Sequence, residues 1–138
     1  MTLNNTNEYR ITVVNKQTAD GMTDTVTESG LGTYRRSGDT IYITYSTDNI
    51  KVLIKAGNGI VNVKRTGDAK SDMRYEQGMR TSFMYRTQFG DIDMSIYTKS
   101  IISRADSDGA KISLSYTLEA GGDKLYNNMT ITVERGAK

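Results

Sequence analysis

The sequence predicts an all-β protein, a single antiparallel meander that closes into a barrel of about eight to ten strands. Three observations predict it: the residue composition, the even spacing of turn residues, and the alternation of apolar and polar side chains between the turns. Isoleucine, valine, threonine and tyrosine supply 46 of the 138 residues, whereas leucine and alanine supply 13. β-Branched and aromatic side chains suit a pleated sheet, and leucine and alanine favour helices. The composition therefore favours strands.

Short segments rich in glycine, aspartate and asparagine recur along the chain. These residues reach the positive φ angles of tight hairpins at little steric cost, so each segment predicts a turn. The eight segments are Ala19-Asp20-Gly21, Ser37-Gly38-Asp39, Thr47-Asp48-Asn49, Gly57-Asn58-Gly59, Thr66-Gly67-Asp68, Phe89-Gly90-Asp91, Ser107-Asp108-Gly109 and Gly121-Gly122-Asp123.

Between these turns, apolar residues fall at every second position. A period of two predicts strands with one buried and one solvated face. The inward residues expected on this basis are Tyr9, Ile11 and Val13; Ile41, Ile43 and Tyr45; Ile50, Val52 and Ile54; Val61 and Val63; Met73 and Tyr75; Phe83 and Tyr85; Ile92, Met94 and Ile96; Ile112, Leu114, Tyr116 and Leu118; and Leu125, Met129, Ile131 and Val133.

Closure into a barrel is expected because the sequence contains no convincing amphipathic helix to cover an open sheet. Closing the sheet buries one face and removes both edges. A two-sheet sandwich is the alternative architecture. The length favours one domain over residues 1–138, with an ordered core from about residue 8 to 134.

The composition also excludes several classes of function. The chain has no cysteine, histidine, tryptophan or proline, which removes disulfides, thiolate metal sites, cysteine nucleophiles and the commonest general base. The pairs Asp91-x-Asp93 and Asp106-x-Asp108 lack the further oxygen ligands of a calcium loop. A net charge of +2 argues against a nucleic-acid partner. We therefore expect a non-enzymatic protein without a metal or redox cofactor.

The first ten residues, MTLNNTNEYR, have neither the basic nor the apolar region of a secretory signal. No apolar run approaches the roughly 18 residues that a membrane helix needs. These features predict a cytoplasmic protein without a membrane partner.

The stretch from Val63 to Ile101 resembles the YwiB-like family of small bacterial proteins. The similarity extends from about residue 8 to 134, is weakest before residue 40, and depends on the order and spacing of several short motifs. They are Arg65-x-Gly67, Arg74-Tyr75-x-x-Gly78, Tyr85 four residues before Phe89-Gly90, Thr98-Lys99-Ser100-Ile101, Asn128-Met129-Thr130-Ile131-Thr132 and the earlier Ile41-Tyr42-Ile43-Thr44-Tyr45. The resemblance implies a lipocalin-like (calycin-type) barrel, and it brings no activity, cofactor or catalytic residue.

Arg65 is the most informative candidate, because alternation places it on the inward face beside Val61 and Val63. Burying an unpaired guanidinium costs several kcal/mol, so it needs a carboxylate, hydroxyls, water or an anionic ligand as its partner. The same alternation turns further polar residues inward. They are Tyr75, Gln77, Thr81, Tyr85, Thr87 and Thr98.

Two interpretations of these residues remain open. In the first, they line a site for a small amphipathic or anionic ligand inside the barrel, with Arg65 as counter-ion and the tyrosines as walls. In the second, Arg65 extends out of the barrel mouth, the tyrosines fill a solid core, and the protein is an interaction or oligomeric module. Outward-facing Tyr42, Met84 and Tyr97 would then suit a homodimer interface.

Overall fold

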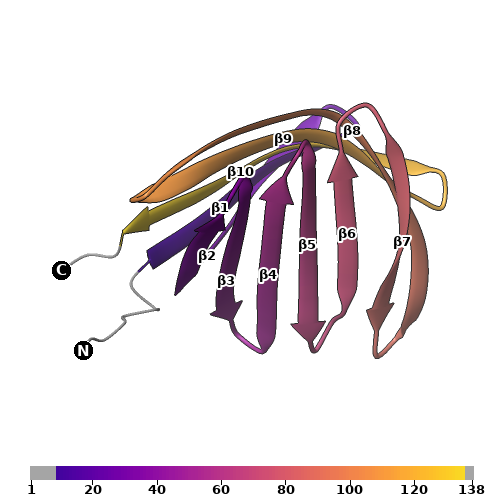
Figure 1. Cartoon of the computed structure of the whole chain (residues 1–138). Helices are drawn as coiled ribbons and strands as arrows, with labels where there is room; N and C mark the ends of the chain where they lie inside the picture. Colours follow the sequence, from indigo (N-terminus) through magenta and orange to yellow (C-terminus); the bar gives the residue numbers. More distant parts are fainter. Residues whose placement is uncertain (1–8, 136–138) are drawn as a thin grey trace.

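A computed structural model describes residues 9–135, and all ten of its strands belong to one antiparallel sheet (Figure 1). The strands are β1 (Tyr9–Ala19), β2 (Met22–Ser37), β3 (Thr40–Thr47), β4 (Ile50–Gly57), β5 (Ile60–Gly67), β6 (Ser71–Glu76), β7 (Arg80–Thr87), β8 (Gly90–Asp106), β9 (Gly109–Ala120) and β10 (Asp123–Arg135).

The strand order is β6-β5-β4-β3-β2-β1-β10-β9-β8-β7, so every pair of hydrogen-bonded neighbours except β1 and β10 is consecutive in sequence. The first and last strands pair from Tyr9↔Arg135 to Thr18↔Tyr126. The two outer strands of the order, β6 and β7, face each other across the remaining seam. The predicted fold class, an all-β meander barrel, is confirmed in this nearly closed form.

All eight predicted turns lie at the junctions between strands. Asp20 and Gly21 have φ angles of 53° and 77°, and Asn58 and Gly59 have 56° and 77°. Two successive positive φ angles are the mark of a tight two-residue hairpin, which matches the right-handed twist of the flanking strands. The ninth junction, residues 77–79 between β6 and β7, contains Gly78 and was not predicted.

The core is formed by the alternate apolar residues of nearly every strand. Ile11, Ile43, Ile96 and Ile112 have no exposed surface at all. The prediction that Ile92 faces the core is wrong: its side chain is 44% exposed. Its ladder is incomplete there, because β9 pairs with β8 only from Ser95 onward.

Strand β2 bends sharply where it leaves β3. It pairs with β1 over its length from Met22 to Gly32, but with β3 only from Gly32 to Ser37. A Cβ atom at Gly32 would lie 1.8 Å from the Thr44 carbonyl oxygen, and one at Gly30 would lie 2.7 Å from that of Ser46. Only glycine permits this close approach of two backbones, and it allows the sheet to turn a corner here.

Residues 9–135 contain no helix that is long and apolar enough to span a membrane.

Candidate functional site

Arg65, on β5, points toward the space enclosed by the sheet, and its partner is a carboxylate. Its Nη1 atom donates to both carboxylate oxygens of Glu28 at 3.3 Å, and the two side chains are 25% and 23% exposed. Both bonds are longer than a close charge-assisted hydrogen bond, and both use one of the three guanidinium nitrogens. Arg65 is therefore neutralised inside the protein and keeps donor capacity for another acceptor.

Glu28 reaches Arg65 because β2 extends beyond the end of β3. It lies opposite Val13 of β1, so the pleat directs its side chain toward the interior. The Tyr45 hydroxyl on β3 donates to the same carboxylate at 2.7 Å. Burial raises the pKa of Tyr45, the Glu28 carboxylate raises it further, and the positive charge of Arg65 opposes the shift. The three residues thus link β2, β3 and β5.

Two more tyrosines face the same interior. The rings of Tyr75 on β6 and Tyr116 on β9 meet edge to face, with their centroids 4.7 Å apart. Burial raises the pKa of both hydroxyls, and the charge of Arg65 lowers each in part, so Arg65 lies within electrostatic range of both. Glu28, Tyr45, Arg65, Tyr75 and Tyr116 are called the interior polar cluster below.

Three buried polar atoms near this interior have no hydrogen-bond partner among the described residues: Ser71 Oγ, Asn15 Oδ1 and Thr98 Oγ1. Ser71 is opposite Arg65 in the β5–β6 ladder and is 7% exposed. A buried polar group without a partner costs about 1–3 kcal/mol, so such groups usually meet water or a ligand. Ser71 thereby adds an unused hydroxyl beside the guanidinium.

The seam between β6 and β7 gives access to this region. Its backbone is joined at the single bridge Lys70↔Arg86, and near the turn the Thr81 hydroxyl donates to the Arg74 carbonyl oxygen at 2.5 Å. Continuing the register of the bridge would place Asp72 opposite Met84, but no ladder joins β6 to β7. The strands are therefore fastened near both ends and parted between them.

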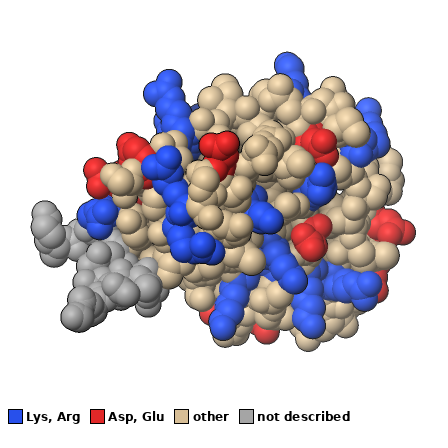
Figure 2. All heavy atoms as spheres, viewed as in Figure 1, with Lys and Arg blue, Asp and Glu red and all other residues tan. Residues whose placement is uncertain are grey.

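A cavity of about 600 Å³ lies over this parted segment, called the slit below. It is lined by residues from both faces of the sheet: Asn62, Lys64, Arg65, Thr66, Lys70, Ser71, Asp72, Arg74, Ser82, Phe83, Met84 and Arg86. Five of these are basic and one is acidic. Figure 2 shows blue side chains predominating over red ones on the lower part of the face formed by β4 to β6. The lining of the slit thus combines a basic outer rim with Arg65 and Ser71.

Comparison with known proteins places this architecture in a family. The model of a domain of unknown function, DUF1934, matches residues 11–131. The chain belongs to the DUF1934 family. A relative described as the uncharacterized beta-barrel protein YwiB of Bacillus subtilis (strain 168) is 30% identical over 122 residues, which cover 85% of this chain and 86% of YwiB.

The crystal structure of the ywiB protein from Bacillus subtilis has a TM-score of 0.84 to this structure and is 29% identical in sequence. The match covers 94% of this chain and 92% of that one. The family resemblance inferred from the motifs is confirmed. Membership of the DUF1934 family therefore accounts for the barrel, and the role of the site follows from the residues of this chain.

Not every residue predicted to face the interior does so in this DUF1934 protein. The prediction for Gln77 is wrong, because β6 ends at Glu76 and Gln77 lies exposed in the turn, where its Oε1 accepts the amide of Ile101. The half-buried Thr87 hydroxyl donates to the carbonyl oxygen of Gly90 and caps the next turn. Thr81 holds the seam, as described above, and Tyr85 is half-buried on β7. Arg65, Tyr75 and Thr98 lie in the interior as predicted.

Glu28 is the functional candidate that the sequence reasoning missed. It lies in a strand whose first six residues are all exposed, so the alternation that revealed the other strands is absent there. The pair Gly30-x-Gly32, two glycines in a strand, is the signal that could have located the bend and the strand before it.

Proposed function

We propose that this protein binds a small amphipathic anion, which enters through the slit and reaches Arg65. The observation that carries the proposal is the slit itself, a cavity of about 600 Å³ whose lining combines a basic rim with a largely buried arginine and an unpartnered buried serine. Basic side chains draw an anion toward the opening, and buried donors fix its head group.

The rim supports attraction of an anion because two of its lysines are uncompensated, whereas Arg74 pairs with Glu76 at 3.1 Å. Lys64 and Lys70 form no ion pair with the described residues, and Arg86 is 4.0 Å from Asp91. Phe83 and Met84 add apolar surface to the same wall. An anion with an apolar body therefore matches the lining better than a simple inorganic ion.

In this proposal Arg65 is not the only charge that faces the ligand. Because Glu28 already neutralises it, the bound head group would share the guanidinium with Glu28 and also accept from Ser71 Oγ. Such sharing favours a head group with several acceptor oxygens, such as a sulfonate, phosphate or carboxylate.

The test uses 8-anilinonaphthalene-1-sulfonate, an amphipathic anion whose fluorescence rises on binding. Lys70→Glu reverses one charge at the slit, and Lys111→Glu on β9 makes the same change of charge far from it. We expect saturable binding by the native protein, about 5-fold weaker binding by Lys70→Glu, and unchanged binding by Lys111→Glu.

A third variant, Lys51→Glu, lies on the outer face of β4 and does not line the slit. Absence of saturable binding, equal effects of Lys70→Glu and Lys111→Glu, or a loss confined to Lys51→Glu would each overturn the proposal. Near-ultraviolet circular dichroism checks that every variant keeps its packed core, because this dye also binds loosely packed states. Native mass spectrometry of the protein from its own host then seeks a retained molecule.

A further inference from the structure

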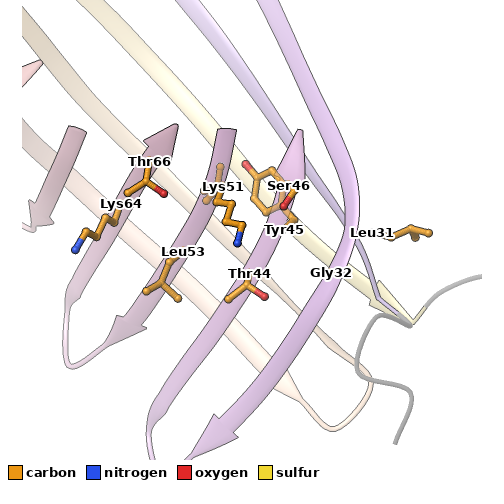
Figure 3. Close-up of a pocket in the computed structure, with 10 residues that line it drawn as sticks. Leu31, Gly32, Thr44, Tyr45, Ser46, Lys51, Leu53, Lys64 and Thr66 are labelled. Carbon is orange, nitrogen blue, oxygen red and sulfur yellow. The ribbon is translucent and has the colours of Figure 1, made fainter. Parts of the chain in front are cut away.

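A second and larger cavity lies on the outside of the sheet, at the bend of β2. It is a groove of about 750 Å³ across the outer faces of β3, β4 and β5 and is lined by Leu31, Gly32, Thr44, Tyr45, Ser46, Lys51, Val52, Leu53, Lys64 and Thr66. Figure 3 shows Lys51, Leu53, Lys64 and Thr44 side by side on neighbouring strands, with Leu31 beyond Gly32 on β2. This surface is called the outer groove.

The outer groove combines apolar and basic side chains. Leu53 is 42% exposed and Leu31 is 55% exposed. Lys51 and Lys64 project beside Leu53, form no ion pair with the described residues, and meet no acidic residue in the lining. The surface is therefore complementary to a molecule that presents apolar and acidic groups together on one face.

The groove ends at an unpaired strand edge. Between Met22 and Leu31, β2 has a partner on its β1 side, and in the described part of the chain no strand pairs with its other side. Met22 and Val26 on this segment are 73% and 51% exposed. A segment that paired with this edge would run along β2 and not across the strands, so the edge bounds the groove and does not extend it.

We propose that the outer groove binds an extended segment of a partner protein that presents both apolar and acidic side chains on the face toward the groove. The groove crosses four strands, a span of about 14 Å, which an extended peptide covers with about four or five residues. Its acidic side chains would pair with Lys51 and Lys64, and an apolar one would cover Leu53.

A second copy of this chain fits the groove less well. Joined through the same face, two copies would bring Lys51 and Lys64 of both together, and like charges across an isologous contact oppose association.

The experiment measures fluorescence anisotropy of a dye-labelled peptide of about eight residues in which pairs of leucines alternate with pairs of glutamates, so that each face of the extended peptide carries both residue types. The control peptide has lysine in place of every glutamate and carries the same dye. We expect the acidic peptide to bind and the basic one to bind at least about 10-fold more weakly. Lys51→Glu should weaken the acidic peptide about 10-fold and Leu53→Asn about 5-fold, while Lys111→Glu leaves it unchanged.

Several results would overturn the proposal: no binding at about 1 mM peptide, equal affinity for both peptides, or no effect of Lys51→Glu. A dimer seen by analytical ultracentrifugation and lost in Lys51→Glu would assign the groove to a second copy. Lys64 and Thr66 line both cavities, whereas Lys70 lines only the slit, so Lys70→Glu should weaken the dye at the slit and leave the peptide affinity unchanged. Failure at one site therefore does not decide the other.

Discussion

The barrel is closed by two junctions of opposite character. Strands β1 and β10, the first and last in the chain, share a continuous ladder from Tyr9↔Arg135 to Thr18↔Tyr126. Strands β6 and β7 follow one another in sequence, yet a single bridge, Lys70↔Arg86, joins their backbones. The first and last strands are thus joined by a continuous ladder, whereas β6 and β7 are joined by one backbone bridge.

The contrast shows that side-chain packing, rather than closeness in sequence, decides which pair of strands is joined firmly. Ile11, Ile131 and Val133 at the β1–β10 junction are 0%, 1% and 3% exposed. At the seam, Phe83 and Tyr85 are only half-buried. Buried apolar surface stabilises the first junction, whereas the second buries less of it and is held less firmly.

The largest expected effect is on the free energy of unfolding. Ile131→Ala removes a core side chain from the β1–β10 junction and should destabilise the protein by about 3–4 kcal/mol, because it leaves a cavity. Phe83→Ala at the seam should cost about 1–2 kcal/mol, since the ring is already in part solvated. Urea denaturation followed by circular dichroism measures both. Equal losses would show that the seam is packed as firmly as the other junction.

Amide hydrogen exchange tests the same contrast without a substitution. The amides in the middle of β6 and β7 that face the seam should exchange at least about 100-fold faster than the paired amides of β1 and β10, because they have no partner strand and their exchange needs no global opening. Mass spectrometry or NMR of the native protein at neutral pH provides the rates. Uniform protection across the ten strands would contradict an open slit.

A smaller effect is expected at the ion pair behind the slit. Glu28→Gln should lower the free energy of unfolding by about 2 kcal/mol, because it leaves Arg65 without its counter-charge and weakens the acceptor of Tyr45. Partial exposure of both charges keeps the loss below that of a fully buried pair. Glu76→Gln, which breaks the exposed pair with Arg74, is the matched control and should cost less than about 0.5 kcal/mol. Thermal and urea unfolding compare the two, and similar losses would remove Glu28 from the proposed site.

The smallest effect concerns alkaline pH. Burial and Glu28 raise the pKa of Tyr45 in the folded state, so its neutral form is favoured there. The stability that follows from a raised pKa is complete below the unfolded value near 10 and is lost as the pH rises toward the folded value. Between pH 9 and 11, Tyr45→Phe should therefore lose about 1 kcal/mol less stability than the native protein. Identical pH profiles would mean that water reaches this hydroxyl.

Much of the fold was predictable because turns and alternation are local signals. A tight hairpin is predicted directly by dipeptides such as Asn58-Gly59 and Asp20-Gly21. A buried strand face is predicted by the spacing of Ile41, Ile43 and Tyr45. Strand β2 was not predicted, because its first six residues are all exposed and show no alternation of apolar and polar side chains. The turn at Gln77 was not predicted either, because Gly78 stands among polar residues that also suit a strand.

The site was less predictable than the fold. Alternation located Arg65, Tyr75 and Thr98 inside, but it could not supply Glu28, which comes from a strand 37 residues earlier. Nor could it show that Lys70, Arg74 and Arg86 share one rim, because that depends on two strands parting rather than pairing. Contacts of this kind follow from closure of the whole sheet.

Because Tyr9 pairs with Arg135, the first and last strands are neighbours and the strand order is circular. Starting at β7 and passing through β10 to β1 and on to β6, the strand order in space is the order along a ring, interrupted between β6 and β7. A permuted gene that joins the two present ends by a short linker and begins near Gly78 would encode every neighbouring pair as a hairpin. Its new termini would then flank the opening through which we expect the ligand to pass.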